Sequence, residues 1–317
     1  MSETITLATR QAYGKALAEL AEKYPQLVVL DADLSKSTMT ADFRKAAPER
    51  FFNAGIAEAN MTCMAGGLAA SGKTVFISSF AVFTAGRAYE QILNTVCISG
   101  LNVKIAATHA GLTVGEDGMS HQMLMDLALM RTLPGMRVMV PADAVETRFM
   151  VEEAINTQGP VYLRLGRAKT PGIYPADHSF TPGKISVLRE GNDLTIAACG
   201  MLVAPALAAA ERLQEEGVAA RVLNVSTIKP LDKETLLKAA RETGAIVTCE
   251  EHNILGGLGG AVAEAVAEAC PVPVLPLGVA DRFGQSGKPE ELLELYGLNP
   301  ENIRKKALQA LALKDQA

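Results

Sequence analysis

The sequence predicts an α/β protein of two domains, each with a parallel sheet between two layers of helices. Apolar runs rich in β-branched residues alternate with helix-like stretches along the chain, which is typical of parallel sheets covered on both faces. The alternation is interrupted once, after Gly166, by a stretch rich in Pro, Gly and Asp that has no sustained period. A chain of 317 residues with 49% hydrophobic content can bury more than one core, and the size favours about two domains.

The first domain is expected over residues 1–170. Its predicted strands are five apolar runs, at 27–32, 74–80, 103–109, 137–142 and 160–166. Helix-like segments lie before and between them, at 5–23, 56–71, 83–98, 123–131 and 143–156. Parallel strands of this kind place their carboxyl ends at one edge of the sheet, where such folds bind ligands.

Residues 171–190 are predicted to link the domains, and residues 191–317 to form the second, smaller domain. There the alternation resumes, with strands at 194–200, 220–226, 245–251 and 272–278 and a helix at 201–217. The GGLGG segment at 256–260 lies between a strand and a helix-like run, but it lacks the spacing and the acidic residue of a dinucleotide site. We interpret it as a packing turn at a helix start.

Composition argues against several classes of function. A formal net charge of −5, with Lys and Arg scattered along the chain, provides no basic surface for nucleic acid or an anionic membrane. No apolar run reaches the roughly 18 residues of a membrane span, and the N-terminus does not have a signal peptide's apolar core, so a cytoplasmic protein is expected. The five scattered cysteines form no CxxC pair and are interpreted as buried thiols rather than disulfides or a zinc site.

The segment from Gly67 to Thr74 matches the phosphate-loop pattern GxxxxGK[ST] letter for letter. A working phosphate loop needs a strand before it and a helix after it, so that helix amides meet the phosphates. Here an Ala- and Met-rich stretch precedes Gly67 and the strand-forming TVFISSF follows Lys73. Because the order is reversed, we reject the nucleotide-hydrolase interpretation.

Glu58 raises the question of function. It stands alone among Gly, Ile, Ala and Met in NAGIAEANM (53–61), where burial would penalise its charge. At the start of a helix, a carboxylate facing the helix dipole is the ordinary explanation. However, Phe80 and Phe83 follow at the carboxyl end of a predicted strand, and the next strand ends in His109 and a polar, Gly-rich loop.

At these residues the chain resembles the transketolase family of thiamine diphosphate enzymes. The segments GIAEANM, SSFAVF, THAGLTVGEDGMSHQ and LRLGR follow one another in the family's order, and the similarity continues through DLTIAACG and LNVSTIKPLD to the end of the chain. The resemblance covers almost the whole sequence. It implies a pyrimidine-binding domain followed by the smaller transketolase C-terminal domain, as in a transketolase whose chain is split in two.

The resemblance explains the lone carboxylate. The cofactor becomes active when its own aminopyrimidine removes the thiazolium proton, and a carboxyl group in an apolar pocket is suited to hydrogen-bond the pyrimidine ring. By the resemblance Glu58 is that catalytic and cofactor-binding group. Phe80 and Phe83 are then aromatic walls against the aminopyrimidine, and Asp33 and Leu34 lie against the cofactor. Without the resemblance, plain core packing would explain the two Phe residues.

The resemblance also implies a substrate site for sugar phosphates. Residues that match phosphate-holding positions are suited to charge-assisted hydrogen bonds; they are Arg10, Ser37, His109 and Arg167. Asp117 and His121 match positions that address sugar hydroxyls, and His121 is also expected to move protons. The alternatives are a surface loop histidine at 121 and a strand-end cap at 109; a zinc site using both lacks a spaced third ligand. Many family members have an acidic residue where this chain has Ala110, which leaves the sugar preference open.

The expected reaction is transfer of a two-carbon ketol unit from a ketose phosphate to an aldose phosphate, such as the pentose phosphates. The family anchors the cofactor's diphosphate through a divalent cation held by a GDG motif and a later Asn, which this sequence lacks. Magnesium requires carboxylates and phosphate oxygens in near-octahedral array. We therefore expect an N-terminal transketolase subunit to supply the diphosphate and Mg²⁺ site, in a dimer of heterodimers.

Three alternatives remain. The β subunit of a 2-oxo acid dehydrogenase shares the architecture and the pyrimidine-contacting Glu, although GEDGMSHQ is more similar to sugar-phosphate enzymes. Deoxyxylulose-phosphate synthase is also related, but it usually keeps both halves on one chain. A non-catalytic partner could keep the fold and lose the chemistry, although the presence of Glu58, Phe80 and His109 together argues against it.

Overall fold

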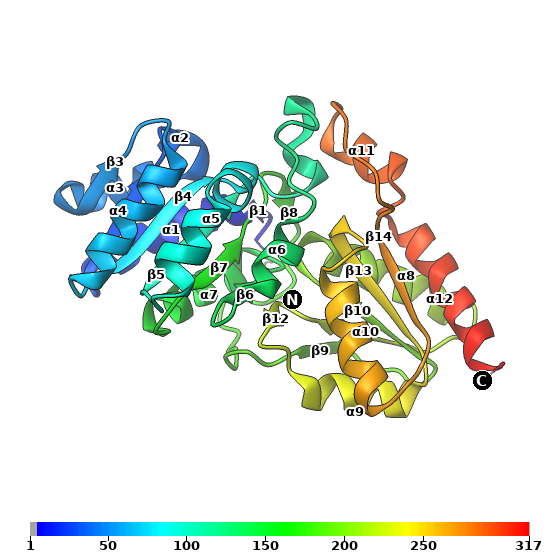
Figure 1. Cartoon of the computed structure of the whole chain (residues 1–317). Coiled ribbons are helices and arrows are strands. Elements are labelled where there is room, and N and C mark those ends of the chain that lie inside the picture. Colours follow the sequence, from blue (N-terminus) through cyan, green and yellow to red (C-terminus); the bar gives the residue numbers. More distant parts are fainter. Residues whose placement is uncertain (1–4, 317) are drawn as a thin grey trace.

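The computed structural model describes residues 5–316 and contains two α/β units, each built on its own main sheet (Figure 1). The first sheet has seven strands in the order β12-β6-β7-β5-β4-β2-β3. Its strands are β2 (Leu27–Asp31), β3 (Phe51–Asn53), β4 (Thr74–Phe80), β5 (Val103–Thr108), β6 (Arg137–Met139), β7 (Val161–Arg164) and β12 (Thr227–Lys229). All pair in parallel except β12, which runs antiparallel to β6.

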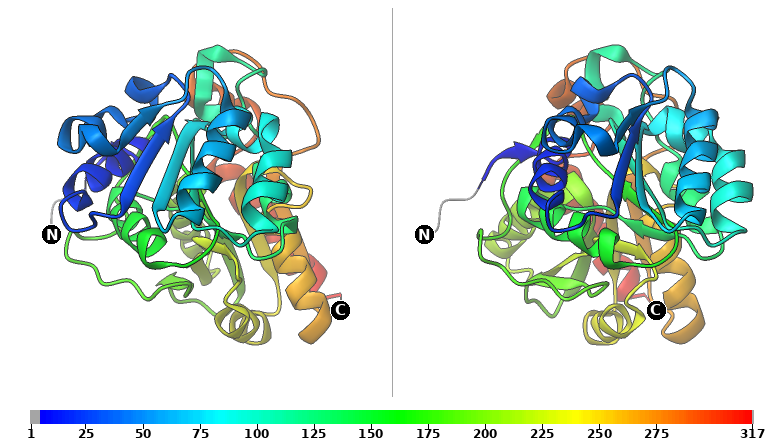
Figure 2. Two further views of the ribbon diagram at one scale, coloured as in Figure 1. Left: turned by 60° about the vertical axis from the view of Figure 1, so that its left-hand side comes forward. Right: turned by 90° about the vertical axis from the view of Figure 1, so that its left-hand side faces the viewer.

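Helices cover both faces of this sheet (Figure 2). They are α1 (Thr9–Leu20), α2 (Ser35–Thr38), α3 (Ala41–Ala46), α4 (Glu58–Ala70), α5 (Tyr89–Gln91), α6 (Asp126–Thr132) and α7 (Ala144–Asn156). Alternate residues of one strand serve the two faces, because successive side chains of a strand point in opposite directions. In β2, Val29 packs into the core formed with α1 and α7, whereas Leu30 packs into the core formed with α4 and α6.

The second sheet has five strands in the order β14-β13-β10-β11-β9. They are β9 (Ser186–Arg189), β10 (Leu194–Ala198), β11 (Ala220–Asn224), β13 (Ile246–Asn253) and β14 (Val274–Val279). The helices are α8 (Val203–Glu215), α9 (Lys233–Thr243), α10 (Leu258–Ala269), α11 (Pro289–Leu295) and α12 (Pro300–Lys314). Buried residues of α8 and α12 share one core, and those of α9 and α10 join a core that continues into the first domain.

The predicted fold class is confirmed, and each predicted strand overlaps an observed one, although β13 and β14 extend one or two residues beyond the predicted ends. Four short pairings were not foreseen. The first is that of β3 with β2. β9 lies inside the expected linker and pairs with β11, β12 leaves the second half of the chain to extend the first sheet, and β1 (Leu7–Ala8) pairs with β8 (Lys169–Thr170). Strands of two to four residues carry too little pattern to be predicted.

The helix expected over 83–98 is not a regular α-helix. Wide π-type turns at η2 (Val82–Arg87) and η3 (Ile92–Cys97) flank the short α5. Such a turn accommodates an extra residue, which a helical period does not reveal, and it is frequent at functional sites. The helix expected from residue 5 begins at Thr9, and the one expected over 123–131 spans Asp126–Thr132.

The two glycine-rich motifs have structural roles. The GxxxxGK[ST] match joins the end of α4 to the start of β4, with Gly72 at φ +91°, so the order is helix then strand as predicted. In the GGLGG segment, the amides of Leu258 and Gly259 donate to the Glu250 carboxylate at 2.7 and 2.8 Å. Glu250 therefore occupies the start of α10, and the packing-turn interpretation is confirmed.

The prediction of five buried thiols is correct in part. Cys199 and Cys249 are buried, Cys97 and Cys270 are half-buried, and Cys63 is exposed on α4. All of them are free. Among residues 5–316, no helix combines the length and the apolar character needed to cross a membrane.

Candidate active site

An aromatic cluster lies at the carboxyl edge of the first sheet. Phe80 is the last residue of β4, and His109 follows the last residue of the neighbouring β5. The ring of Phe80 stacks on that of His109, with centroids 3.7 Å apart, and on that of Phe83, at 5.9 Å with an angle of 11° between the planes. The His121 ring meets Phe80 and Phe83 edge-on, at 6.2 and 5.4 Å. The structure thus joins four residues that the sequence nominated separately.

His109 is buried and held in a left-handed backbone conformation, with φ at +56°. Its Nδ1 shares a hydrogen bond of 2.9 Å with the Thr108 hydroxyl. Burial is the largest cause that lowers the pKa of His109 to about 3, and the positive charges of Arg10 and Arg167 and the nearby His121 contribute to this shift. His109 is therefore a neutral imidazole at ordinary pH, so it can exchange hydrogen bonds with a ligand but brings no charge.

Glu58 is the first residue of α4 and only 2% exposed. Its Oε2 accepts a hydrogen bond of 3.0 Å from Arg87, whose guanidinium lies 4.9 Å from the centre of the Phe83 ring. Arg87 therefore connects the buried carboxylate to the aromatic cluster. The sequence analysis did not select Arg87, although its position four residues after Phe83 in a helical stretch is the spacing at which side chains meet.

Arg10 and Arg167 provide the positive charge near His109. Arg10 donates to the backbone oxygen of Ser37 at 2.6 Å, so Ser37 contributes its carbonyl to this contact rather than its hydroxyl. Burial, followed by the charge of Arg167, lowers the pKa of Arg10. The repulsion between the two guanidinium groups favours the binding of an anion beside them.

Arg167 also holds the loop that follows β5. It donates to the backbone oxygen of Val114 and, at 3.3 Å, to Glu116, and it lies 4.0 Å from the Asp117 carboxylate. We call residues 109–122 the substrate loop; it includes the 3₁₀ segment η4 (Leu112–Asp117). Arg167 thus lies near both the Asp117 carboxylate and His109.

Asp33 and Leu34 follow β2, which lies beside β4 in the sheet. Asp33 has φ at +64° and exchanges hydrogen bonds with Asn53, through its amide at 3.1 Å and its carboxylate at 2.9 Å. The Leu34 amide donates to the buried Asp31 at 2.6 Å. This turn therefore has a fixed shape at the carboxyl edge, where the predicted cofactor contact would occur.

Ala110 is buried and lines a small cavity of about 20 Å³ between the domains, together with Thr113, Arg164 and Glu251.

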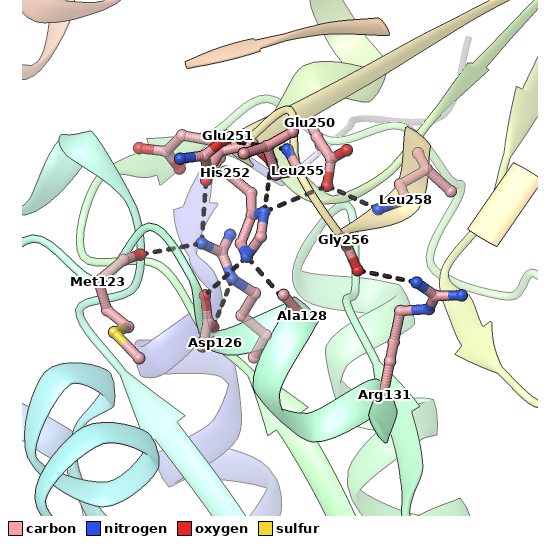
Figure 3. Close-up of polar contacts among 12 residues, drawn as sticks. Met123, Asp126, Ala128, Arg131, Glu250, Glu251, His252, Leu255, Gly256 and Leu258 are labelled. Carbon is pink, nitrogen blue, oxygen red and sulfur yellow. Dashed lines mark hydrogen bonds and ion pairs between the residues drawn. The ribbon is translucent and has the colours of Figure 1, made fainter. Parts of the chain in front are cut away.

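A cluster of buried polar side chains lies at the same contact between the domains, and the sequence analysis did not predict it. The Arg164 side chain donates to Asp126 at 2.7 Å and to the backbone oxygen of Glu251 at 2.9 Å. Figure 3 shows His252 between Asp126 and Glu250. Its Nε2 lies 4.0 Å from the Asp126 carboxylate, and its Nδ1 lies 3.7 Å from the Glu250 carboxylate.

Within residues 5–316, no three His, Cys, Asp or Glu side chains are grouped as a metal site.

The chain is an α/β protein with a buried carboxylate and stacked aromatic rings at the carboxyl edge of a parallel sheet, the edge where such folds bind ligands. Family models agree on which kind: residues 5–172 match the transketolase pyrimidine-binding domain and residues 183–303 the transketolase C-terminal domain. The chain belongs to the transketolase family.

Three relatives align with this chain over nearly their full length. A protein of Methanocaldococcus jannaschii named as a transketolase C-terminal section is 50% identical, over 95% of this chain and 96% of that protein. A 6-deoxy-6-sulfo-D-fructose transketolase subunit of a Clostridium species is 42% identical, over 96% and 95%. A solved structure described as a split gene transketolase, inactive β4 tetramer, superposes with a TM-score of 0.89 at 54% identity, over 97% of this chain and 99% of that one.

Proposed function

We propose that this chain is one subunit of a thiamine diphosphate-dependent transketolase, which moves a two-carbon ketol unit from a ketose phosphate to an aldose phosphate. The observation that carries the proposal is the position of Glu58, buried at the start of α4 and connected through Arg87 to the stacked Phe80 and Phe83. A family match to the pyrimidine-binding domain supports the same cofactor.

The residues of this site fit an aminopyrimidine. The stacked rings of Phe80 and Phe83 offer a flat apolar surface, and Glu58 offers a carboxyl group to a ring nitrogen. Asp33 and Leu34 would border the cofactor at the end of β2. When bound, thiamine diphosphate supplies the nucleophilic carbon that carries the ketol unit. Glu58 then has a proton-holding role at the pyrimidine ring, for which its burial is suited.

The remaining residues suit a phosphorylated sugar. Arg10 and Arg167 are placed to bind a phosphate, because each brings a permanent charge and several N–H donors. His109 would add a neutral hydrogen bond to it. Asp117 would accept from a sugar hydroxyl, and His121, whose Nδ1 lies 2.9 Å from the Ser120 hydroxyl, would transfer protons near the reacting carbonyl.

A second subunit would supply the diphosphate and Mg²⁺ site, with the cofactor between the two chains and two such pairs in the assembly. Two comparisons support this part of the proposal. One relative is named as a subunit, and the structurally similar relative is described as a split gene product whose β4 tetramer is inactive.

The test is ketol transfer from xylulose 5-phosphate to ribose 5-phosphate with thiamine diphosphate and Mg²⁺. We expect no turnover by this chain alone and turnover after mixing with a GDG-bearing transketolase subunit. The sulfosugar relative makes 6-deoxy-6-sulfo-D-fructose a second donor to assay. Turnover by the isolated chain would refute the need for a partner, and a mixture that is inactive with both donors but active on 2-oxo acids would replace the transketolase proposal.

A further inference from the structure

The C-terminal domain contacts the substrate loop at its turn. The backbone amide of Thr113 donates to the Glu251 carboxylate at 2.6 Å. Glu251 is the sixth residue of β13 and only 5% exposed. The distance is at the short end for a hydrogen bond, so a side chain of the second domain directly fixes the backbone of the loop at Thr113.

The loop is shaped for this carboxylate. Gly111 has φ at +87°, and a Cβ atom at this position would overlap the carboxyl group of Glu251. A residue with a side chain would therefore be strained in its backbone and would also displace Glu251. The loop passes this close to β13 because position 111 is glycine.

Glu251 is itself held in place. The backbone oxygen of Glu251 accepts from Arg164 at 2.9 Å, and Arg164 is buried against Asp126, to which it donates at 2.7 Å. Tyr162 donates to the same Asp126 oxygen at 2.7 Å. These contacts join the end of β7 to β13, so the carboxylate that holds the loop is attached to both sheets.

A second set of contacts fixes the other end of the loop. The Gln122 side chain donates to the backbone oxygens of Leu112 and Gln285, each at 3.0 Å. Gln285 belongs to the segment before α11, and a Cβ atom at Gly118 would overlap the Ser286 hydroxyl. The C-terminal domain thus holds the loop at both ends, and the loop carries His109, Asp117 and His121 between or beside these points.

We propose that Glu251 is a positioning residue, through which the C-terminal domain sets the geometry of the substrate loop and hence the binding of the sugar substrate. The expected effect on sugar binding rests on the proposed function. The expected effect on the loop does not, because it concerns contacts within this chain. Glu250, the preceding residue, provides a matched comparison because it is also buried and also binds backbone amides, those of α10.

The first experiment measures hydrogen exchange of the full chain over peptides from residues 109–122. Glu251→Ala and the milder Glu251→Asp, whose carboxylate is one methylene shorter, should raise exchange in this loop. Glu251→Gln should restore protection, because its carbonyl can still accept from the Thr113 amide. Glu250→Gln should leave the loop unchanged. Unchanged exchange in Glu251→Asp, or an equal effect from Glu250→Gln, would overturn the proposal.

The second experiment measures kinetics in the two-subunit complex. For Glu251→Asp, KM for the ketose phosphate should rise by about tenfold, the effect expected from the loss of one buried hydrogen bond, with a smaller change in kcat. Glu251→Gln should recover most of the affinity. An equal loss in Glu251→Asp, Glu251→Gln and the control Glu250→Gln would indicate general destabilisation and refute positioning. If the wild-type complex is inactive while the exchange results hold, the proposed function fails and the positioning role stands.

Discussion

The guanidinium of Arg87 donates to Glu58 at 3.0 Å while it lies 4.9 Å from the centre of the Phe83 ring. One side chain therefore bridges the buried carboxylate and the aromatic cluster. Arg87 is itself 55% exposed, so this ion pair is open to solvent on one side. A ligand that enters between Phe83 and Glu58 would meet a carboxylate that is already oriented.

Replacing Glu58 by Ala should abolish turnover of the two-subunit enzyme, because the pyrimidine ring loses its hydrogen-bonding carboxyl group. The expected loss in kcat is at least about 100-fold, the lower range for removing a general acid or base. The measurement is steady-state ketol transfer with saturating cofactor, with sedimentation to establish that the subunits still assemble. Turnover equal to that of the wild type would eliminate the role assigned to Glu58.

Replacing Arg167 by Ala should weaken binding of phosphorylated sugars. The loss of one charged hydrogen-bond donor corresponds to about 1.5–3 kcal/mol, or roughly a 10- to 100-fold increase in KM. The assay compares xylulose 5-phosphate with unphosphorylated xylulose, for which KM should change little. Arg241→Ala is the control, because Arg241 is an exposed arginine on α9. An equal increase for both donors would mean that Arg167 shapes the loop rather than binding phosphate.

The sequence was sufficient to predict the fold class because each main strand is a long apolar run. For example, TVFISSF became β4, buried along its whole length. In contrast, β12 has three residues, and it forms only because the second domain brings it to the edge of the first sheet. Pairing between distant segments of this length leaves no local pattern.

The candidate site, like β12, depends on contacts between distant segments that the sequence pattern does not reveal. Glu58, Phe80 and Phe83 each had an ordinary structural explanation, and the resemblance to a family was needed to group them. Arg87 escaped notice because its partner Glu58 is 29 positions away, and Glu251 because Thr113 is 138 positions away. Partners this far apart in the sequence cannot be recognised from the periodic spacing of residues within one helix or strand. The catalytic, cofactor-binding and substrate-binding roles assigned to the site residues remain predictions.

The low pKa of His109 has a consequence for acid stability. The folded protein holds this group neutral down to a pKa of about 3, whereas the unfolded chain binds the proton below about 6.5. Unfolding therefore takes up a proton, and stability is lost as the pH falls from about 6.5 toward 3. Relative to His109→Gln, the wild type should lose about 1.4 kcal/mol of unfolding free energy per pH unit well below 6.5.

Urea unfolding at pH 7.5 and pH 5.0 measures this difference. Buried carboxyl groups such as Glu251, whose pKa is raised to about 7 by burial, act in the opposite direction, since the folded state binds their proton more readily. Their contribution is common to both proteins and cancels in the comparison. Equal changes in the two proteins between these pH values would show that His109 is protonated in the folded state.

The contributions of Arg164 and Asp126 to the free energy of unfolding should be coupled, because the two side chains form a buried ion pair. Arg164→Met leaves Asp126 buried with the Tyr162 hydroxyl at 2.7 Å as its remaining hydrogen-bond donor among residues 5–316, and removing one partner of a buried ion pair costs about 3–5 kcal/mol. Adding Asp126→Asn in the same chain should recover part of this loss, because the charge is removed with its partner. The free energies of unfolding of the two single variants and the double variant give the coupling. Additive losses would mean that the two side chains act independently and that the contact between the domains depends on apolar packing instead.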